Sequence, residues 1–227
     1  MSASRSPSKL PHRAGFTLIE MIGVLAIIAI LVAAVAPRIF DSISDSKITS
    51  ATSSIKTLQS AVAKYYADVG SLYPLTAAGA ATPLADGVSN AAYGASLPDA
   101  LALASTAAPA TTGAGLWRKF RGPYTEGFTT ANPPIGTSMT MSSVATAAGA
   151  LTATSANFSL ANNATTLFPA NTQLVYVTFL GVGRKEFEKI DGILDEGIGA
   201  TAAQKVLWGK VKWNAATSAL MVYLAHK

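Results

Sequence analysis

A single acidic side chain lies inside the most apolar part of the sequence. Glu20 is the only charged residue in the run of residues 16–36. A carboxylate at the centre of a bilayer costs about 2.5 to 3.5 kcal/mol, and less near its edge, so this acid needs a positive partner or access to the interface. It lies about one helical turn after the junction of Gly15 and Phe16, where a cut would create an ammonium group. A cut there would therefore offer this acid one candidate positive partner.

Few other residues offer catalytic or metal-binding chemistry. The chain has no cysteine, which excludes disulfides, thiolate metal sites and cysteine nucleophiles. Its two histidines, His12 and His226, lie near the two ends, so the usual general bases and imidazole ligands are scarce. We also find no pairing of serine with lysine, or of two carboxylates, that would suit a hydrolase. We therefore expect neither enzymatic activity nor a cofactor.

The positive charge of the chain is concentrated at its start. The formal net charge is +5, and Arg5, Lys9 and Arg13 supply positive charge in an opening segment without acids. The rest is close to neutral, so composition gives no reason to expect nucleic acid binding, which needs a stronger or more clustered basic excess. With 50% hydrophobic and 13% charged residues, the chain is too apolar for a disordered protein. It fits one modest globular domain with a further segment attached.

Residues 16–36 predict a membrane-spanning helix. As a helix this run is about 31 Å long, which is enough to cross the hydrocarbon core of a bilayer. The basic residues before it should stay in the cytoplasm, which places the rest of the chain across the membrane. A conventional secretory signal cut near Ala36 is the alternative, although such a signal does not need an acid in its apolar part.

Gly15, Phe16 and the following Thr17-Leu18-Ile19-Glu20 resemble the class III signal of type IV pilins, type II secretion pseudopilins and related prepilin-like proteins. The resemblance implies that a prepilin peptidase removes residues 1–15 at the cytoplasmic face and that Phe16 is then N-methylated. It also implies that Glu20 pairs with the N-terminal ammonium of a neighbouring subunit. In a low-dielectric bundle such a pair could fix the axial register between subunits. An acid merely tolerated in a plain anchor is the alternative.

A second, amphipathic helical stretch is expected over residues 37–70. Pro37 closes the apolar run and removes one backbone donor, so the helix should kink or open locally there without ending. The resemblance implies that the helix can melt near Pro37 during filament assembly, with an ordinary kink as the alternative. Apolar residues then recur at three- and four-residue steps, and Gly70 is the expected C-cap. The apolar residues are Ile39, Ile43, Ile48, Ala51, Ile55, Leu58, Val62, Tyr65, Tyr66 and Val69.

Residues 71–227 predict a globular head with a sheet at its C-terminal end. Runs of apolar and β-branched residues predict strands over residues 174–180, 206–213 and 219–225, the last two joined by a turn at 214–218. An antiparallel sheet of these strands would cover the apolar stripe of the second helical stretch. The expected fold is therefore α+β and pilin-like: a long N-terminal helix, half transmembrane and half amphipathic, packed on a C-terminal antiparallel sheet.

Low-charge segments separate the long helix from these strands. Residues 70–76 resemble the Gly-x-Tyr-Pro turn that often follows the long helix in pilin-like proteins. Residues 76–115 predict a surface segment of turns with a short helix near residues 98–106. Between Arg121 and Arg184 the only charged residue is Glu126, which suits a surface loop or packing between neighbouring subunits.

The densest basic and aromatic cluster of the sequence begins at Trp117. Arg118, Lys119 and Arg121 alternate there with aromatic side chains, just before a Gly-Pro-Tyr sequence. Cations interleaved with aromatic rings can hold phosphates and stack bases, so nucleic acid or another surface is one candidate partner. The interpretation we favour is that these aromatic residues anchor a loop on the sheet.

Five of the acids lie close together near the C-terminal strands, among several glycines. A solvated acidic turn is the favoured interpretation, because the spacing matches no defined calcium loop and Lys185 and Lys189 offer local neutralisation. Some pseudopilins have a calcium site in this region, so a site formed by Asp191, Asp195 and Glu196 is the alternative that the resemblance implies.

The expected function is structural: a subunit of a type IV pilus-like filament that polymerises through its N-terminal helix. A type II secretion pseudopilin, or a membrane-anchored adhesin or DNA-binding minor pilin, is the alternative. The expected partners are pilin-like subunits of the same or another kind, the prepilin peptidase and methylase, an inner-membrane assembly platform and membrane lipid. The expected location is the bacterial inner membrane before assembly, and a periplasmic or extracellular filament afterwards.

Overall fold

A long helix and an antiparallel sheet make up most of the regular structure. The computed structural model describes residues 15–76, 80–81, 97–102, 115–125, 133–147 and 149–227. The chain divides into two compact units, Met1–Ile43 and Ser44–Lys227. Helix α1 (Leu18–Val69) contributes to both units. The other elements are α2 (Leu97–Ala102), the 3₁₀ helix η2 (Gly115–Lys119), β1 (Ser138–Ala145), β2 (Gln173–Leu180), α3 (Arg184–Leu194), α4 (Ala202–Lys205), β3 (Val211–Asn214) and β4 (Ala219–His226).

Helix α1 has the length and the apolar composition that the sequence predicts. Among the described residues it is the one helix long and apolar enough to cross a membrane. The helix continues through Pro37, so the proline does not end it, as expected. Gly70 follows the last helical residue with a φ of +79°, and its amide donates to the carbonyl of Tyr66 at 2.8 Å. This left-handed glycine confirms the predicted C-cap.

The apolar stripe on the second half of α1 is confirmed only from Ile48 onward. Ile48, Ile55 and Val62 are buried against the rest of the C-terminal unit, and Tyr65 donates its hydroxyl hydrogen to the carbonyl of Tyr73 at 2.8 Å. The two predicted stripe residues nearest the apolar run, Ile39 and Ile43, are 52% and 47% exposed, so their inclusion in the core stripe was wrong. Apolar residues spaced three and four apart predict which side of a helix is apolar. They do not predict where along the helix the rest of the protein stops covering that side.

Replacing Ile55 with alanine should destabilise the C-terminal unit by about 2 to 5 kcal/mol, because the side chain is fully buried and its removal leaves a cavity. Ile43→Ala is the matched control and should cost less than about 0.5 kcal/mol, since Ile43 is half exposed. The measurement is denaturant unfolding of the full chain in detergent micelles. Equal costs for the two variants would contradict the observed limit of the stripe.

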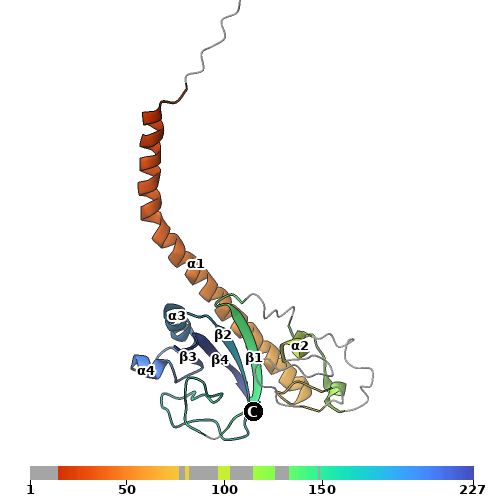
Figure 1. The fold of residues 1–227 in the computed structure, drawn as a ribbon. Helices are drawn as coiled ribbons and strands as arrows, with labels where there is room; N and C mark the ends of the chain where they lie inside the picture. The colour runs from red at the N-terminus through yellow and green to blue at the C-terminus, as the bar shows by residue number, and fades with distance from the viewer. Residues whose placement is uncertain (1–14, 77–79, 82–96, 103–114, 126–132, 148) are drawn as a thin grey trace, which may run out of the picture. The chain divides into compact units, whose positions relative to one another are not determined.

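The C-terminal unit contains a four-stranded antiparallel sheet with the order β1-β2-β4-β3 (Figure 1). Strands β2 and β4 confirm two of the three predicted strands, and the predicted turn at residues 214–218 joins β3 to β4. The architecture is therefore α+β with a pilin-like layout: a long apolar N-terminal helix followed by an antiparallel sheet.

One strand prediction was correct only in its C-terminal part, and one strand was not predicted. The predicted strand at residues 206–213 begins only at Val211, because Gly209 adopts a φ of +94° and packs against the carboxylate of Asp195. Strand β1 lies where the sequence predicts a low-charge loop, and its pairing with β2 makes it an edge of the sheet. Residues 138–142 alternate polar and apolar side chains, which is the pattern of a half-buried strand, but the prediction of a loop rested on the low charge of the segment.

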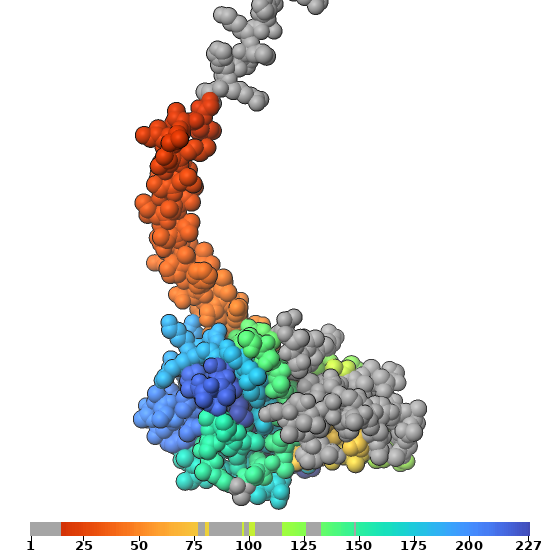
Figure 2. Space-filling view, in the orientation of Figure 1, coloured from red at the N-terminus to blue at the C-terminus, as the bar shows by residue number. Residues whose placement is uncertain are grey.

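Different elements cover the two faces of the sheet. Helices α1 and α3 pack on one face through the larger apolar cluster, which includes Val177 and Val222. Residues 151–168, which we call the strap, cover the other face through Phe158, which packs with Tyr176 and Met221. The strap appears in green to cyan at the lower front of the C-terminal unit in Figure 2. Each face of the sheet therefore has its own apolar cluster.

The predicted short helix near residues 98–106 is confirmed in part by α2. Residues 103–106, and most of the predicted surface segment at residues 76–115, lie outside the described residues. The turn after α1 buries Leu72 and Leu75.

Candidate processing and assembly site

The start of α1 is a reciprocal capping arrangement between Thr17 and Glu20. The backbone amide and the side-chain hydroxyl of Thr17 each donate to Oε2 of Glu20 at 2.8 Å. The amide of Glu20 donates back to the Thr17 hydroxyl oxygen at 3.3 Å. Thr17 is thus the N-cap of α1 and Glu20 its third residue, which is the geometry of a capping box. The Thr-x-x-Glu pattern could have predicted this arrangement from the sequence, but our sequence analysis did not use it.

This arrangement holds the Glu20 carboxylate at the N-terminal end of its own helix. The end of a helix that carries free amide hydrogens favours negative charge. Phe16 directly precedes the Thr17 amide that binds the carboxylate, so a cut after Gly15 would create an ammonium group one residue from that amide. The structure therefore brings Phe16 and Glu20 into one short segment.

Gly15 and Phe16 are both exposed, and Phe16 retains 81% of its accessible surface. A Cβ atom added to Gly15 would meet no atom within 4 Å. The fold therefore has no steric requirement for glycine at this position, and any requirement must come from a molecule that binds this segment. Pro37 lies elsewhere, roughly 26 Å from Glu20 along α1 at 1.5 Å per residue. It is not part of the same local arrangement.

The aromatic side chains after residue 115 face inward. Trp117 and Phe120 are buried, and the indole nitrogen of Trp117 donates to the carbonyl of Thr76 at 2.8 Å. Tyr124 donates its hydroxyl hydrogen to Asp68 of α1 at 2.9 Å, and its ring packs edge-to-face on Tyr65 at 5.6 Å. These aromatic residues anchor their loop as predicted, but on α1 and the turn after it rather than on the sheet.

The three cations of this cluster face outward. Arg118, Lys119 and Arg121 are exposed, and the Arg121 guanidinium donates to the carbonyls of Arg118 and Phe120 at 3.2 and 3.4 Å. The structure therefore separates the cations from the rings that the sequence placed beside them. A ligand at this surface would contact the cations but could not stack on the rings of Trp117 or Phe120. The structure therefore disfavours base stacking at this surface.

The acidic cluster near the C-terminus is not a turn, so that prediction was wrong. Three of the five acids lie on α3, and the other two directly follow it. Glu186 accepts a hydrogen bond from the amide of Gly183 at the start of the helix, and Glu188 forms an ion pair with Arg184 at 2.8 Å. Because this segment contains a glycine and many charged residues, its sequence did not predict a helix.

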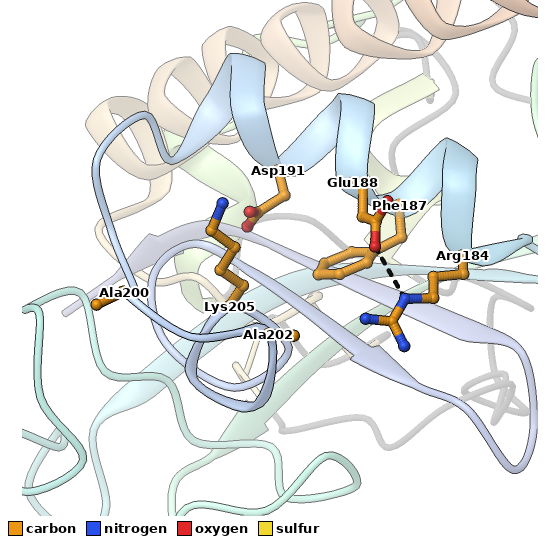
Figure 3. Close-up of a pocket in the computed structure, with 7 residues that line it drawn as sticks. All are labelled: Arg184, Phe187, Glu188, Asp191, Ala200, Ala202 and Lys205. Carbon is orange, nitrogen blue, oxygen red and sulfur yellow. Dashed lines mark hydrogen bonds and ion pairs between the residues drawn. The ribbon is translucent and has the colours of Figure 1, made fainter.

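The three candidate calcium ligands line one small pocket but differ in their exposure. Asp191 and Asp195 are each 4% exposed, whereas Glu196 is exposed to solvent. Oδ2 of Asp195 accepts a hydrogen bond from the amide of Val211 at 2.7 Å. Burial, together with the charge of Asp195, raises the pKa of Asp191 to about 6. Figure 3 shows Asp191 facing Lys205 of α4 across a small pocket.

No group of three or more histidine, cysteine or acidic side chains is placed to hold a metal ion within the described parts of the chain. Oδ1 of Asp191 and Oδ1 of Asp195 are buried without a hydrogen-bond partner among the described residues. Two carboxylates make a poor cation site, and Lys205 already lies on the pocket beside them.

Comparison with known proteins identifies the start of the chain. Residues 10–36 match the family model described as the prokaryotic N-terminal methylation motif. This motif is the class III prepilin signal of type IV pilins and pseudopilins. It supports an exported protein that is pilin- or pseudopilin-like, a structural rather than an enzymatic class. No curated protein and no solved structure matches the chain.

Proposed function

We propose that this chain is a structural subunit of a type IV pilus-like filament. It is exported as a prepilin and cut between Gly15 and Phe16 by a prepilin peptidase, and Phe16 is then N-methylated. The observation that carries this proposal is the methylation motif at residues 10–36, with the Glu20 carboxylate held at the start of an apolar helix. In this view residues 1–15 are the leader, 16–36 the membrane and assembly helix, 37–70 the stalk and 71–227 the head.

The topology of the precursor follows from its charge. The basic leader stays in the cytoplasm and residues 16–36 cross the inner membrane, which places the C-terminal unit on the far side. The junction of Gly15 and Phe16 then lies near the cytoplasmic face, where the peptidase can reach it. Because a Cβ at Gly15 would meet no described atom within 4 Å, a peptidase can bind this junction without disturbing the described fold.

Assembly uses the exposed face of α1 and the new N-terminus. Large apolar side chains of the N-terminal unit are exposed, including Leu25, Ile28 and Leu31. Such a surface can be buried only in lipid or among copies of the same helix. When Glu20 enters that apolar bundle, its charge requires a positive partner, and the Phe16 ammonium of a neighbouring subunit supplies one.

We further propose that Pro37 marks the place where α1 loosens during assembly. Its missing amide leaves one carbonyl of the preceding turn without its helical hydrogen bond, so unfolding of α1 costs least at this point. The other partners are an assembly platform in the inner membrane and membrane lipid, and the final location is a periplasmic or extracellular filament.

Electron microscopy of cells that lack this chain tests the proposed function. We expect surface filaments to disappear and to return when the wild-type gene is restored. Filaments that persist, combined with loss of protein secretion, would instead assign the chain to a type II secretion pseudopilus, which shares the same signal.

The cations at Arg118, Lys119 and Arg121 give a separate prediction. Replacing all three with serine should leave filaments and the thermal midpoint unchanged, because these side chains are exposed. DNA retention by cells that carry the variant should equal the wild-type level, since the neighbouring rings are buried. Loss of DNA retention with intact filaments would instead support the DNA-binding minor pilin.

A further inference from the structure

A lysine is buried completely under the strap. Lys212 of β3 is 0% exposed, and its ammonium nitrogen donates to the carbonyl of Asn157 at 2.8 Å and to that of Thr152 at 3.3 Å. It also donates to the carbonyl of Ser155 and lies 4.5 Å from the centre of the Phe158 ring. All of these contacts are with residues of the strap, which has no helix or strand of its own. One lysine of the sheet therefore binds the strap at several residues.

The strap offers this cation no negative charge. Residues 151–168 contain no acidic or basic residue. Carbonyl oxygens and an aromatic face replace part of the hydration of an ammonium group, but a buried charge without a counter-ion is still disfavoured relative to water.

The strands of the sheet offer Lys212 no negative charge either. Lys212 pairs with Met221 of β4, and the titratable groups of the same apolar cluster are the phenols of Tyr176 and Tyr223. Burial raises the pKa of Tyr223, so it stays neutral, and its oxygen lies 2.6 Å from Nδ1 of His226. The carboxylate of Asp195, which lies beside β3, accepts a hydrogen bond from the amide of Val211. Val211 belongs to the larger cluster on the opposite face of the sheet.

We propose that the strap is a proton-linked latch, which closes most firmly over the sheet when Lys212 is neutral and loosens when its ammonium form must be buried. Opening would carry Lys212 into water and expose the apolar side chains of Phe158 and Met221. The inference does not depend on the proposed filament function.

The direction of the pH dependence follows from burial, which lowers the pKa of Lys212 from 10.5 to about 7 in the closed strap. When the strap is open, the pKa of Lys212 returns to its ordinary value. Between these two values the open form binds a proton that the closed form does not, so the opening constant rises as the pH falls toward 7. Below about 7 both forms are protonated and the dependence levels off. The strap is therefore tight in alkali and loosest near neutral pH and below.

Amide hydrogen exchange of the full chain in detergent micelles at pH 7, 8 and 9 tests the latch. After correction for intrinsic rates, the opening constant reported by the amides of Phe158 and Phe168 should fall about fivefold from pH 7 to 8 and about ninefold from pH 8 to 9. Both amides donate to Oδ1 of Asn157 inside the strap. Amides of β2 should stay better protected at each pH, which separates opening of the strap from unfolding of the whole unit.

Two arginine variants complete the test. Lys212→Arg cannot lose its proton in this range, so its strap should open to the same extent at all three pH values. Lys210→Arg, an exposed neighbour, should follow the wild type. If Lys212→Arg does not fold, the opening constants of the wild-type protein at the three pH values still test the proposal. A wild-type opening constant that is independent of pH, or that rises with pH, would overturn the proposal, as would strap amides that exchange only together with β2.

Discussion

Gly15→Val should leave the full-length prepilin in the membrane, with no cut before Phe16 and no filaments. A bulky β-branched side chain at the junction would block entry of the segment into the peptidase. The effect should be close to complete, because processing precedes every later step. The structure predicts that folding is unaffected, since a Cβ at Gly15 meets no atom within 4 Å. The measurement is the size of the protein in membrane fractions, by immunoblot and mass spectrometry.

Gly23→Val provides the matched control for this variant. A Cβ at Gly23 also meets nothing within 4 Å, and the residue lies in the same apolar helix, away from the proposed cut. It should be processed at the wild-type rate. Normal processing of Gly15→Val would contradict the proposed cleavage site. If neither variant were processed, valine would be acting through the membrane helix.

Glu20→Ala should be processed normally but assemble into filaments at least tenfold less efficiently. An ion pair inside an apolar bundle is screened far less than one in water, whereas a cap on a solvent-exposed helix end contributes little. Loss of the ion pair therefore outweighs loss of the hydrogen bonds to Thr17. Filament yield in a shearing assay, with the ratio of cut to uncut protein, measures both effects.

Glu20→Gln separates the charge from the cap. Glutamine can keep the hydrogen bonds from the Thr17 amide and hydroxyl, because it serves equally in a capping box, but it carries no charge. It should therefore fail to assemble as severely as the alanine variant. Filaments at the wild-type level in Glu20→Gln would assign Glu20 a role in capping α1 alone.

The features predicted correctly from the sequence depend on local patterns. The apolar run and the length of the helix that contains it follow from composition and spacing, which describe them without knowledge of the fold. Strands β2 and β4 were also predicted, because their apolar runs are long and bounded by turn residues. Helix α1 ends at a glycine for the same kind of local reason.

The features that were missed depend on contacts between distant segments. Strand β1 is rich in serine and threonine, and its place at the edge of the sheet depends on the full ladder of partners that β2 offers. The burial of Lys212 depends on a strap more than fifty positions earlier in the sequence, and nothing in the run around β3 distinguishes this lysine from the exposed Lys210. Trp117 turns inward because α1 and the turn after it supply its partners. Neighbours along the chain do not specify these contacts.

The N-terminus of the protein recovered from cell membranes and filaments tests the central claim most directly. Mass spectrometry of the first peptide should find a chain that begins at Phe16 and carries one methyl group on its terminal nitrogen. A functional protein that keeps the residues before Phe16, or one that begins near Ala36, would contradict the account.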